Sequence, residues 1–169
     1  MVDLYDLPLT GTAVRRSEAT PEDLITNWSA YISSYTGKLW PREVIEHWVN
    51  ASVDRILDGC KPGARILEHG CGNGMLLFRC ALHKDVQEVW GADLSGEACN
   101  FLTSVANNPH FAHIKDKIKV LHRPADNFEG IPSNHFDCIA MNAMVMYHLQ
   151  GISLHTCTTI KFEFTARMD

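Results

Sequence analysis

The residues with the clearest chemical potential form the segment Glu68-His-Gly-Cys-Gly-Asn-Gly74, in which an acid precedes three alternating glycines. Glycine lets the backbone adopt conformations that a Cβ forbids, and it lets a ligand come close to the peptide groups. A merely tight turn needs one glycine, so three alternating glycines indicate a site for a small ligand. The dinucleotide fingerprint has its third glycine where Met75 stands, which disfavours NAD and FAD.

Two acids follow apolar segments further along the chain. Asp93 ends one such segment, and an acid at the carboxyl end of a strand can accept hydrogen bonds from both hydroxyls of a ribose. The alternative for Asp93 is the N-cap of a helix that starts near Ser95. Asp126 follows the next apolar segment, where a carboxylate could accept from an exocyclic amine such as that of adenine. The alternative for Asp126 is an ordinary loop residue.

Three more polar residues, Asn142, Tyr147 and His148, emerge from the apolar stretch 138–146. We expect them at the carboxyl end of a fourth strand, on the ligand side of the sheet. Tyr147 and His148 are the candidates for a general base. A solvent-exposed start of a helix is the alternative for these two residues.

The elements that must position these residues follow from the hydrophobic pattern. After residue 62, short apolar runs alternate with helical stretches, which is typical of strand–helix–strand units and a parallel sheet. The expected strands are 64–68, 88–93, 118–122 and 136–142, and the expected helices are 75–82 and 97–106. The fold class is therefore α/β, with the N-terminal half of a doubly wound parallel sheet.

Two helices are expected before the sheet. Thr20-Pro-Glu-Asp23 places a cap, a proline and two acids at the start of a short helix. Apolar residues then recur at helical spacing over 43–57 and stop at Gly59, so this amphipathic helix should cover a core from one side.

Composition and charge exclude several classes of function. The chain has 169 residues, of which 46% are hydrophobic and 21% charged, as expected of one globular domain. The net charge is -5 and no basic run is longer than Arg15-Arg16, so no nucleic-acid surface is indicated. An acidic N-terminus without a long apolar run predicts a cytoplasmic chain that does not bind membranes. The cysteines are scattered, which predicts reduced thiols. His110 and His113 are the only closely spaced histidines in the sequence, so no metal site is predicted.

Together these features resemble the class I S-adenosylmethionine-dependent methyltransferases, and in more detail the N-methyltransferase domains of nonribosomal peptide synthetases. The segments that carry the detailed resemblance are Ser33-Ser-Tyr-Thr-Gly37, the helix 43–57, 65–78, Trp90-Gly-Ala-Asp-Leu94, Ala125-Asp-Asn-Phe-Glu-Gly130 and 136–147. The resemblance covers about residues 27–148. It implies a Rossmann-like methyltransferase fold with an N-terminal helical lid.

The resemblance also implies which residues bind the cofactor, S-adenosylmethionine. They are Tyr35, Glu68, Gly70, Gly72, Gly74, Asp93, Leu94 and Asp126. Glu68 and the three glycines would cradle the methionine and the ribose, and Asp93 would hold the ribose hydroxyls. Leu94 and Asp126 would flank and read the adenine. Tyr35 would belong to the lid over the pocket.

The implied reaction is an in-line displacement in which a neutral amine attacks the methyl carbon of the sulfonium. An α-amino group has a pKa of about 7.7 to 8.0, so an appreciable fraction is neutral near pH 7 and positioning can dominate catalysis. Asn142 would face the methyl group. The implied acceptor is an aminoacyl group on a carrier protein or a small molecule. His69, Met146 and His148 replace residues that are usual in these domains.

The resemblance does not extend over residues 149–169. A domain of this family continues through another helix and three more strands, so we expect a truncated chain with an atypical tail. Apolar residues alternate over 160–165, which predicts a strand that pairs beside 136–142; the alternative is a disordered tail and a protein that aggregates. We therefore divide the chain into a lid segment (1–40), a partial cofactor-binding domain (41–148) and the tail. A non-catalytic fragment or interaction module is the alternative function, and a nucleotide-binding oxidoreductase is disfavoured.

Overall fold

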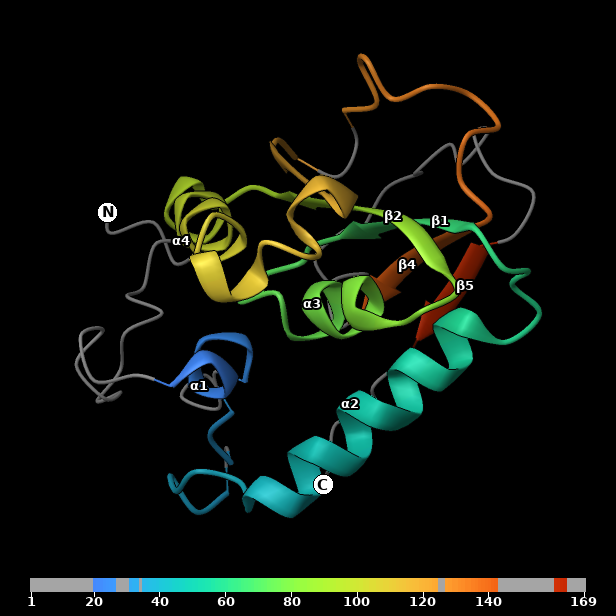
Figure 1. The fold of residues 1–169 in the computed structure, drawn as a ribbon. Helices are drawn as coiled ribbons and strands as arrows, with labels where there is room; N and C mark the ends of the chain where they lie inside the picture. The colour runs from blue at the N-terminus through green and yellow to red at the C-terminus, as the bar shows by residue number, and fades with distance from the viewer. Residues whose placement is uncertain (1–19, 27–30, 34, 125–126, 143–159, 164–169) are drawn as a thin grey trace.

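The computed structural model describes residues 20–26, 31–33, 35–124, 127–142 and 160–163, and they form one parallel sheet with flanking helices (Figure 1). The strands are β1 (Ala64–His69), β2 (Val86–Asp93), β3 (Ile118–His122), β4 (Cys138–Asn142) and β5 (Ile160–Glu163). Their order is β3-β2-β1-β4-β5, and every neighbouring pair is parallel. The strand order reverses between β1 and β4, which confirms the doubly wound topology.

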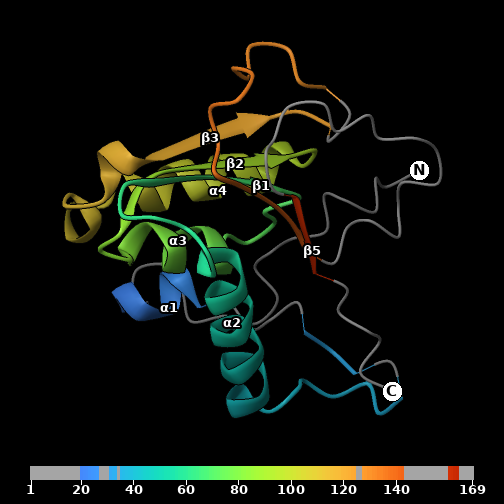
Figure 2. The same cartoon turned by 90° about the vertical axis from the view of Figure 1, so that its right-hand side faces the viewer.

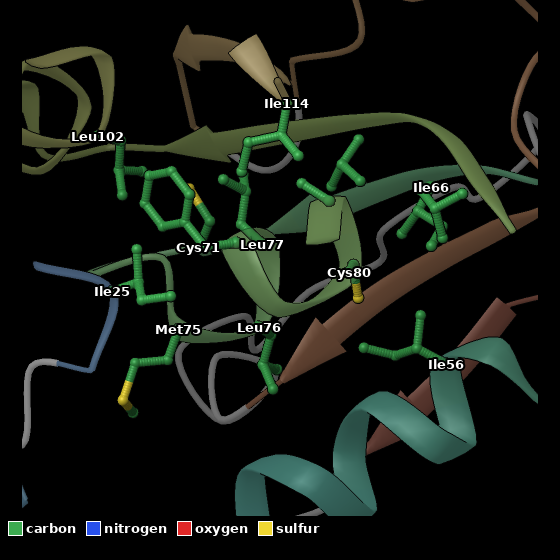
Figure 3. Close-up of a cluster of buried hydrophobic side chains, with 14 of the residues drawn as sticks. Ile25, Ile56, Ile66, Cys71, Met75, Leu76, Leu77, Cys80, Leu102 and Ile114 are labelled. Carbon is green, nitrogen blue, oxygen red and sulfur yellow. The ribbon is translucent and has the colours of Figure 1, made fainter. Parts of the chain in front are cut away.

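The helices lie on one face of the sheet (Figure 2). They are α1 (Pro21–Ile25), α2 (Arg42–Leu57), α3 (Met75–Leu82) and α4 (Gly96–Ala106), and the short 3-10 turns Pro109–Phe111 and Lys115–Lys117 lead into β3. Their apolar side chains meet β1 and β2 in the main core, in which Ile66, Leu77 and Leu102 are fully buried (Figure 3). The helices thus cover the side of the sheet that carries the even-numbered residues of β1.

The opposite face of the sheet is covered by the segment between β3 and β4 (Figure 2). Leu67, Trp90 and Met141 point to this side and pack with Ile131 and Phe136. Because successive strand residues point to opposite faces, the neighbours Ile66 and Leu67 of β1 contribute to the cores on the two sides of the sheet.

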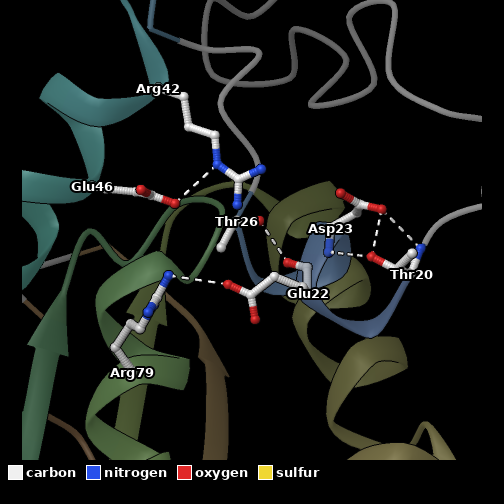
Figure 4. Close-up of polar contacts among 7 residues, drawn as sticks. All are labelled: Thr20, Glu22, Asp23, Thr26, Arg42, Glu46 and Arg79. Atoms are coloured by element: carbon white, nitrogen blue, oxygen red, sulfur yellow. Dashed lines mark hydrogen bonds and ion pairs between the residues drawn. The ribbon is translucent and has the colours of Figure 1, made fainter.

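The N-terminal helix α1 docks on α3 (Figure 4). Thr20 caps the helix, as the sequence predicted, and its hydroxyl and backbone also form a capping box with Asp23. Glu22 forms an ion pair with Arg79 of α3 at 3.3 Å, but both side chains are solvent-accessible, so the pair stabilises the contact little. The burial of Ile25 in the main core therefore dominates this contact.

Strand β5 confirms the sequence-based prediction for the tail. Residues 160–163 pair with β4 in parallel, and Ile139 lies opposite Ile160. The last two residues of the predicted strand, 164–165, lie outside the described residues. Strand β5 satisfies backbone groups that would otherwise form the edge of β4. Among the described residues, none of the helices has the length and apolar composition that crossing a membrane requires.

Removal of β5 tests its contribution to stability. Deletion of residues 158–169 should lower the melting temperature and increase aggregation, because it exposes the edge and apolar face of β4. In a chain of this size each kcal/mol lost lowers the melting temperature by about 2–4 °C. Differential scanning calorimetry and light scattering measure both effects. Deletion of 164–169 alone, which retains β5, is the control; equal melting of both variants and the full chain would contradict the role of β5.

Candidate cofactor-binding site

The turn between β1 and α3 is held against the carboxyl end of β2. The backbone N–H groups of Gly70 and Cys71 donate to the Ala92 carbonyl oxygen at 2.8 and 3.2 Å. The next N–H, that of Gly72, donates to Oδ2 of Asp93 at 2.7 Å. The motif predicted to bind a small ligand and the acid predicted to bind a ribose are therefore in direct contact.

Two glycines of this turn have different structural roles. Both have a positive φ, 50° at Gly72 and 77° at Gly74. A Cβ on Gly74 would overlap the side chain of Leu102 and press on the Phe78 ring, whereas a Cβ on Gly72 would have no atom within 4 Å. Gly74 thus permits the packing of α3 against α4. Gly72 borders open space, from which a ligand can approach its peptide group.

Asp93 is positioned by backbone hydrogen bonds on both of its carboxylate oxygens. Oδ2 accepts from Gly72, and Oδ1 accepts from the N–H of Ser95 at 2.9 Å. A carboxylate has about four acceptor positions, so each oxygen can still accept one ligand hydroxyl. The alternative role for Asp93 is wrong, because Ser95 is the N-cap of α4 and accepts from the N–H of Ala98.

Leu94 follows Asp93 at the same edge of the sheet. Its side chain is 49% exposed, and its carbonyl oxygen is 2.9 Å from Nε2 of His122, the last residue of β3. The contact fixes the backbone beside Asp93 while the apolar side chain stays accessible. Such a side chain can pack against the face of a planar heterocycle.

Glu68 is the most unusual charged residue of the site. It lies on the helix side of β1, it is only 4% exposed, and its Oε2 atom has no hydrogen-bond partner among the described residues. Burial and, to a smaller extent, the nearby Asp93 carboxylate raise the pKa of Glu68, a backbone hydrogen bond from Leu77 opposes the shift, and the resulting pKa is about 8. The acid therefore keeps its proton at neutral pH in the free protein.

Tyr31 is a residue near the candidate site that the sequence analysis did not single out. Its ring packs against Trp48 of α2 with the centroids 5.6 Å apart, and its carbonyl oxygen accepts from the N–H of Trp40. Burial and the charge of Glu68 both raise the pKa of Tyr31, so the two side chains share one electrostatic environment. No spacing pattern marks Tyr31, because this contact arises only when the chain folds back over α2. Tyr35, the expected lid residue, is 69% exposed.

The predicted acceptor side is described in part. Asn142 ends β4, and its Oδ1 atom is buried without a hydrogen-bond partner among the described residues. It lies on the same side of the sheet as Glu68, because Ala140 of β4 belongs to the helix-side core. The other predicted residues of the site, Asp126, Tyr147 and His148, lie outside the described residues. His69 is fully buried on the opposite face, where its ring packs edge-to-face on Phe128.

No metal site was found in the part of the chain that the structure describes. That part contains no group of three or more His, Cys, Asp or Glu side chains that could hold an ion. The described cysteines are free, and all but Cys60 are buried. Burial raises the pKa of the Cys71 and Cys80 thiols well above the usual value, which keeps them protonated.

Comparison with known proteins identifies the family of this chain. Residues 66–158 match the family model described as a methyltransferase domain. The chain is 37% identical over 129 residues to chondramide synthase cmdD of Chondromyces crocatus, and 27% identical over 132 residues to nonribosomal peptide synthetase TES of Alternaria alternata. These alignments cover 75% and 78% of this chain but only 3% and 2% of the two relatives.

Solved structures show the same fold. The TrmK structure of M. capricolum in complex with S-adenosyl-homocysteine superposes with a TM-score of 0.54 at 9% identity, covering 68% of this chain and 50% of TrmK. The family match covers more than half of the chain, so the chain belongs to the methyltransferase-domain family. It has the Rossmann-like fold of class I S-adenosylmethionine-dependent methyltransferases, which confirms the fold expected from the sequence.

Alanine substitutions at the two glycines separate the cost of steric overlap from the cost of backbone strain. Gly74→Ala should destabilise the protein by about 2–4 kcal/mol, because the methyl group meets Leu102 and a left-handed backbone disfavours a Cβ. Gly72→Ala should cost only about 1–2 kcal/mol, since only the backbone term applies. Urea unfolding monitored by circular dichroism gives both values. Equal destabilisation by the two substitutions would show that the Leu102 contact does not matter.

The pH dependence of stability tests the state of Glu68. Its pKa is higher in the folded protein than in the unfolded chain, so its contribution is complete below the unfolded value and is lost as pH rises through about 8. The stability of the wild type relative to Glu68→Gln should therefore fall between about pH 5 and 8, by at most about 1.4 kcal/mol per pH unit. Urea titrations of both proteins measure this difference. A difference independent of pH would contradict the assignment.

Proposed function

We propose that this chain binds S-adenosylmethionine at the carboxyl edge of β1 and β2 and transfers its methyl group to the amine of an aminoacyl or peptidyl acceptor. The observation that carries the proposal is the contact between Gly72 and Asp93. It places a ligand-accessible backbone turn beside a carboxylate with free acceptor positions.

The residues of the site fit the chemical groups of the cofactor. Asp93 can accept from the two ribose hydroxyls, and the exposed Leu94 offers an apolar surface to the adenine. No described atom lies within 4 Å of where a Cβ on Gly72 would be, so a ligand can approach this peptide group. Glu68 has a buried oxygen without a partner, and a carboxyl group in that position favours a positively charged ligand.

The relatives and the chemistry of amines support the acceptor class. Chondramide synthase and nonribosomal peptide synthetase TES support an aminoacyl or peptidyl acceptor, because the second is named as an enzyme that assembles peptides. When bound, S-adenosylmethionine supplies an electrophilic methyl group on a sulfonium. The chain spans only 2–3% of the length of these relatives. That the acceptor is carried by a carrier protein is therefore part of the proposal.

Asn142 is the described residue best placed to orient the acceptor. Its unpartnered Oδ1 can accept a hydrogen bond from an amine N–H, which would direct the nitrogen lone pair away from Asn142. The amine reacts in its neutral form, and the proton that it loses passes to solvent or to a base. Tyr147 and His148 stay the predicted candidates for that base.

Substitution of Asp93 tests the cofactor assignment. Asp93→Ala removes the acceptor of two ribose hydroxyls, at about 1.5–3 kcal/mol each, so the affinity for S-adenosylmethionine should fall at least about tenfold. Isothermal titration calorimetry measures the affinity. Asp137→Ala is a matched control, because Asp137 also accepts a backbone N–H, that of Arg65, at the opposite end of β1. Unchanged affinity in a folded Asp93→Ala protein would refute the site.

The acceptor assignment requires a test of turnover. Asn142→Ala should lower the rate of methyl transfer to an aminoacyl thioester at least about tenfold while S-adenosylmethionine still binds, because only acceptor orientation is lost. Mass spectrometry detects the methylated product. The same thioester with its amine acetylated should not react. Binding of the cofactor without methylation of any amine would favour the non-catalytic binding module instead.

A further inference from the structure

Glu68 and Asp93 lie near the ends of adjacent strands, but the protein provides different numbers of hydrogen-bond donors to their two carboxyl groups. Asp93 accepts a backbone N–H on each oxygen. Glu68 is almost completely buried, and its Oε2 accepts from no described residue. The protein therefore supplies donors for one carboxylate of the site and leaves an oxygen of the other without one.

Among the described residues, the titratable groups that interact with Glu68 offer no positive charge to compensate it. The titratable groups that interact with it come from four elements. They are Asp93 of β2, Cys71 of the turn after β1, Cys80 of α3 and Tyr31 of the segment before α2. All four are neutral or negative. His69, the next residue of β1, points to the opposite face and packs on Phe128.

A carboxyl group in such surroundings is favoured in its neutral form. Desolvation disfavours the charge, and a second carboxylate nearby disfavours it further. The pKa of about 8 for Glu68 agrees with this geometry. A positively charged ligand stabilises the ionised form of Glu68 and so favours loss of the proton, whereas an uncharged ligand of similar shape does not.

On the basis of the proposed function, we propose that Glu68 makes the site selective for positive charge by exchanging its proton for the cationic part of S-adenosylmethionine. In the free protein Glu68 is the neutral acid. When the cofactor binds, the O–H bond of Glu68 breaks, the proton passes to solvent, and the carboxylate remains beside the cation. Binding is thus coupled to the release of one proton.

The pH range in which this coupling is visible follows from the two protonation states. Below the pKa of free Glu68, each binding event must release the proton, so affinity should rise with pH by about tenfold per unit. Between about pH 6 and 7 the α-amino group of the cofactor, with a reference pKa of about 7.7–8.0, stays protonated and does not confuse the result. Above about pH 8 the rise should end, because Glu68 is already ionised.

Calorimetry of the wild-type chain measures the released proton directly. S-adenosylmethionine is titrated at about pH 6.5 in phosphate and in imidazole, whose ionisation enthalpies differ, and the difference in observed enthalpy gives the number of protons released. We expect about one proton per cofactor bound. Glu68→Gln, which imitates the neutral acid, should release fewer than about 0.2 protons and lose the rise of affinity with pH.

The neutral analogue 5′-methylthioadenosine provides the matched ligand control. It has the nucleoside and the sulfur of the cofactor but neither its sulfonium nor its ammonium group. Its binding to the wild type should release no proton, and its affinity should not rise with pH. Proton release by this analogue, or the same release by wild type and Glu68→Gln with the cofactor, would overturn the inference.

The outcomes separate this inference from the proposed function. Tight binding of S-adenosylmethionine that weakens in Asp93→Ala but releases no proton would refute charge exchange and leave the cofactor site intact. Absence of any binding by the folded wild type would refute both.

Discussion

The close packing of helix α3 on strand β2 is the constraint on which the rest of the structure depends. At Gly91 an added Cβ would overlap Leu77 of α3 and press on Cys71 of the preceding turn. Because these elements touch without an intervening side chain, the chain must reverse direction immediately after β1. The glycines of the turn make this reversal possible, and its N–H groups then face the end of β2.

The candidate site is a consequence of that packing. The turn packed against β2 brings Gly72 to Asp93, and the strand order reverses between β1 and β4, a point at which ligands bind in open α/β sheets. Polar groups that would be costly elsewhere gather here. Glu68 and Asn142 both carry buried oxygens without partners in the described part of the chain. Such unsatisfied groups in a native protein call for a ligand or solvent as their partner.

In the proposed function, the two acids of the site would bind different parts of one ligand. Asp93 is oriented by two backbone N–H groups, so it can present fixed acceptor positions to hydroxyl groups. Glu68 has a buried oxygen without such support, so in the proposed site its protonation would depend on the charge of the ligand. Asp93 on β2 would thus recognise a ligand by fixed hydrogen-bond geometry, and Glu68 on the neighbouring strand β1 would recognise it by charge.

The sequence by itself determined the features that depend on local patterns. Strands β1 to β4, helices α2 to α4 and the glycine turn were predicted to within a few residues, because hydrophobic period and glycine spacing are local. Even β5 followed from the alternation after Ile160. Only the tertiary structure decided that Glu68 interacts with Tyr31 and that its buried Oε2 atom has no partner among the described residues. These properties depend on desolvation and on neighbours distant along the chain, which no spacing of residues records.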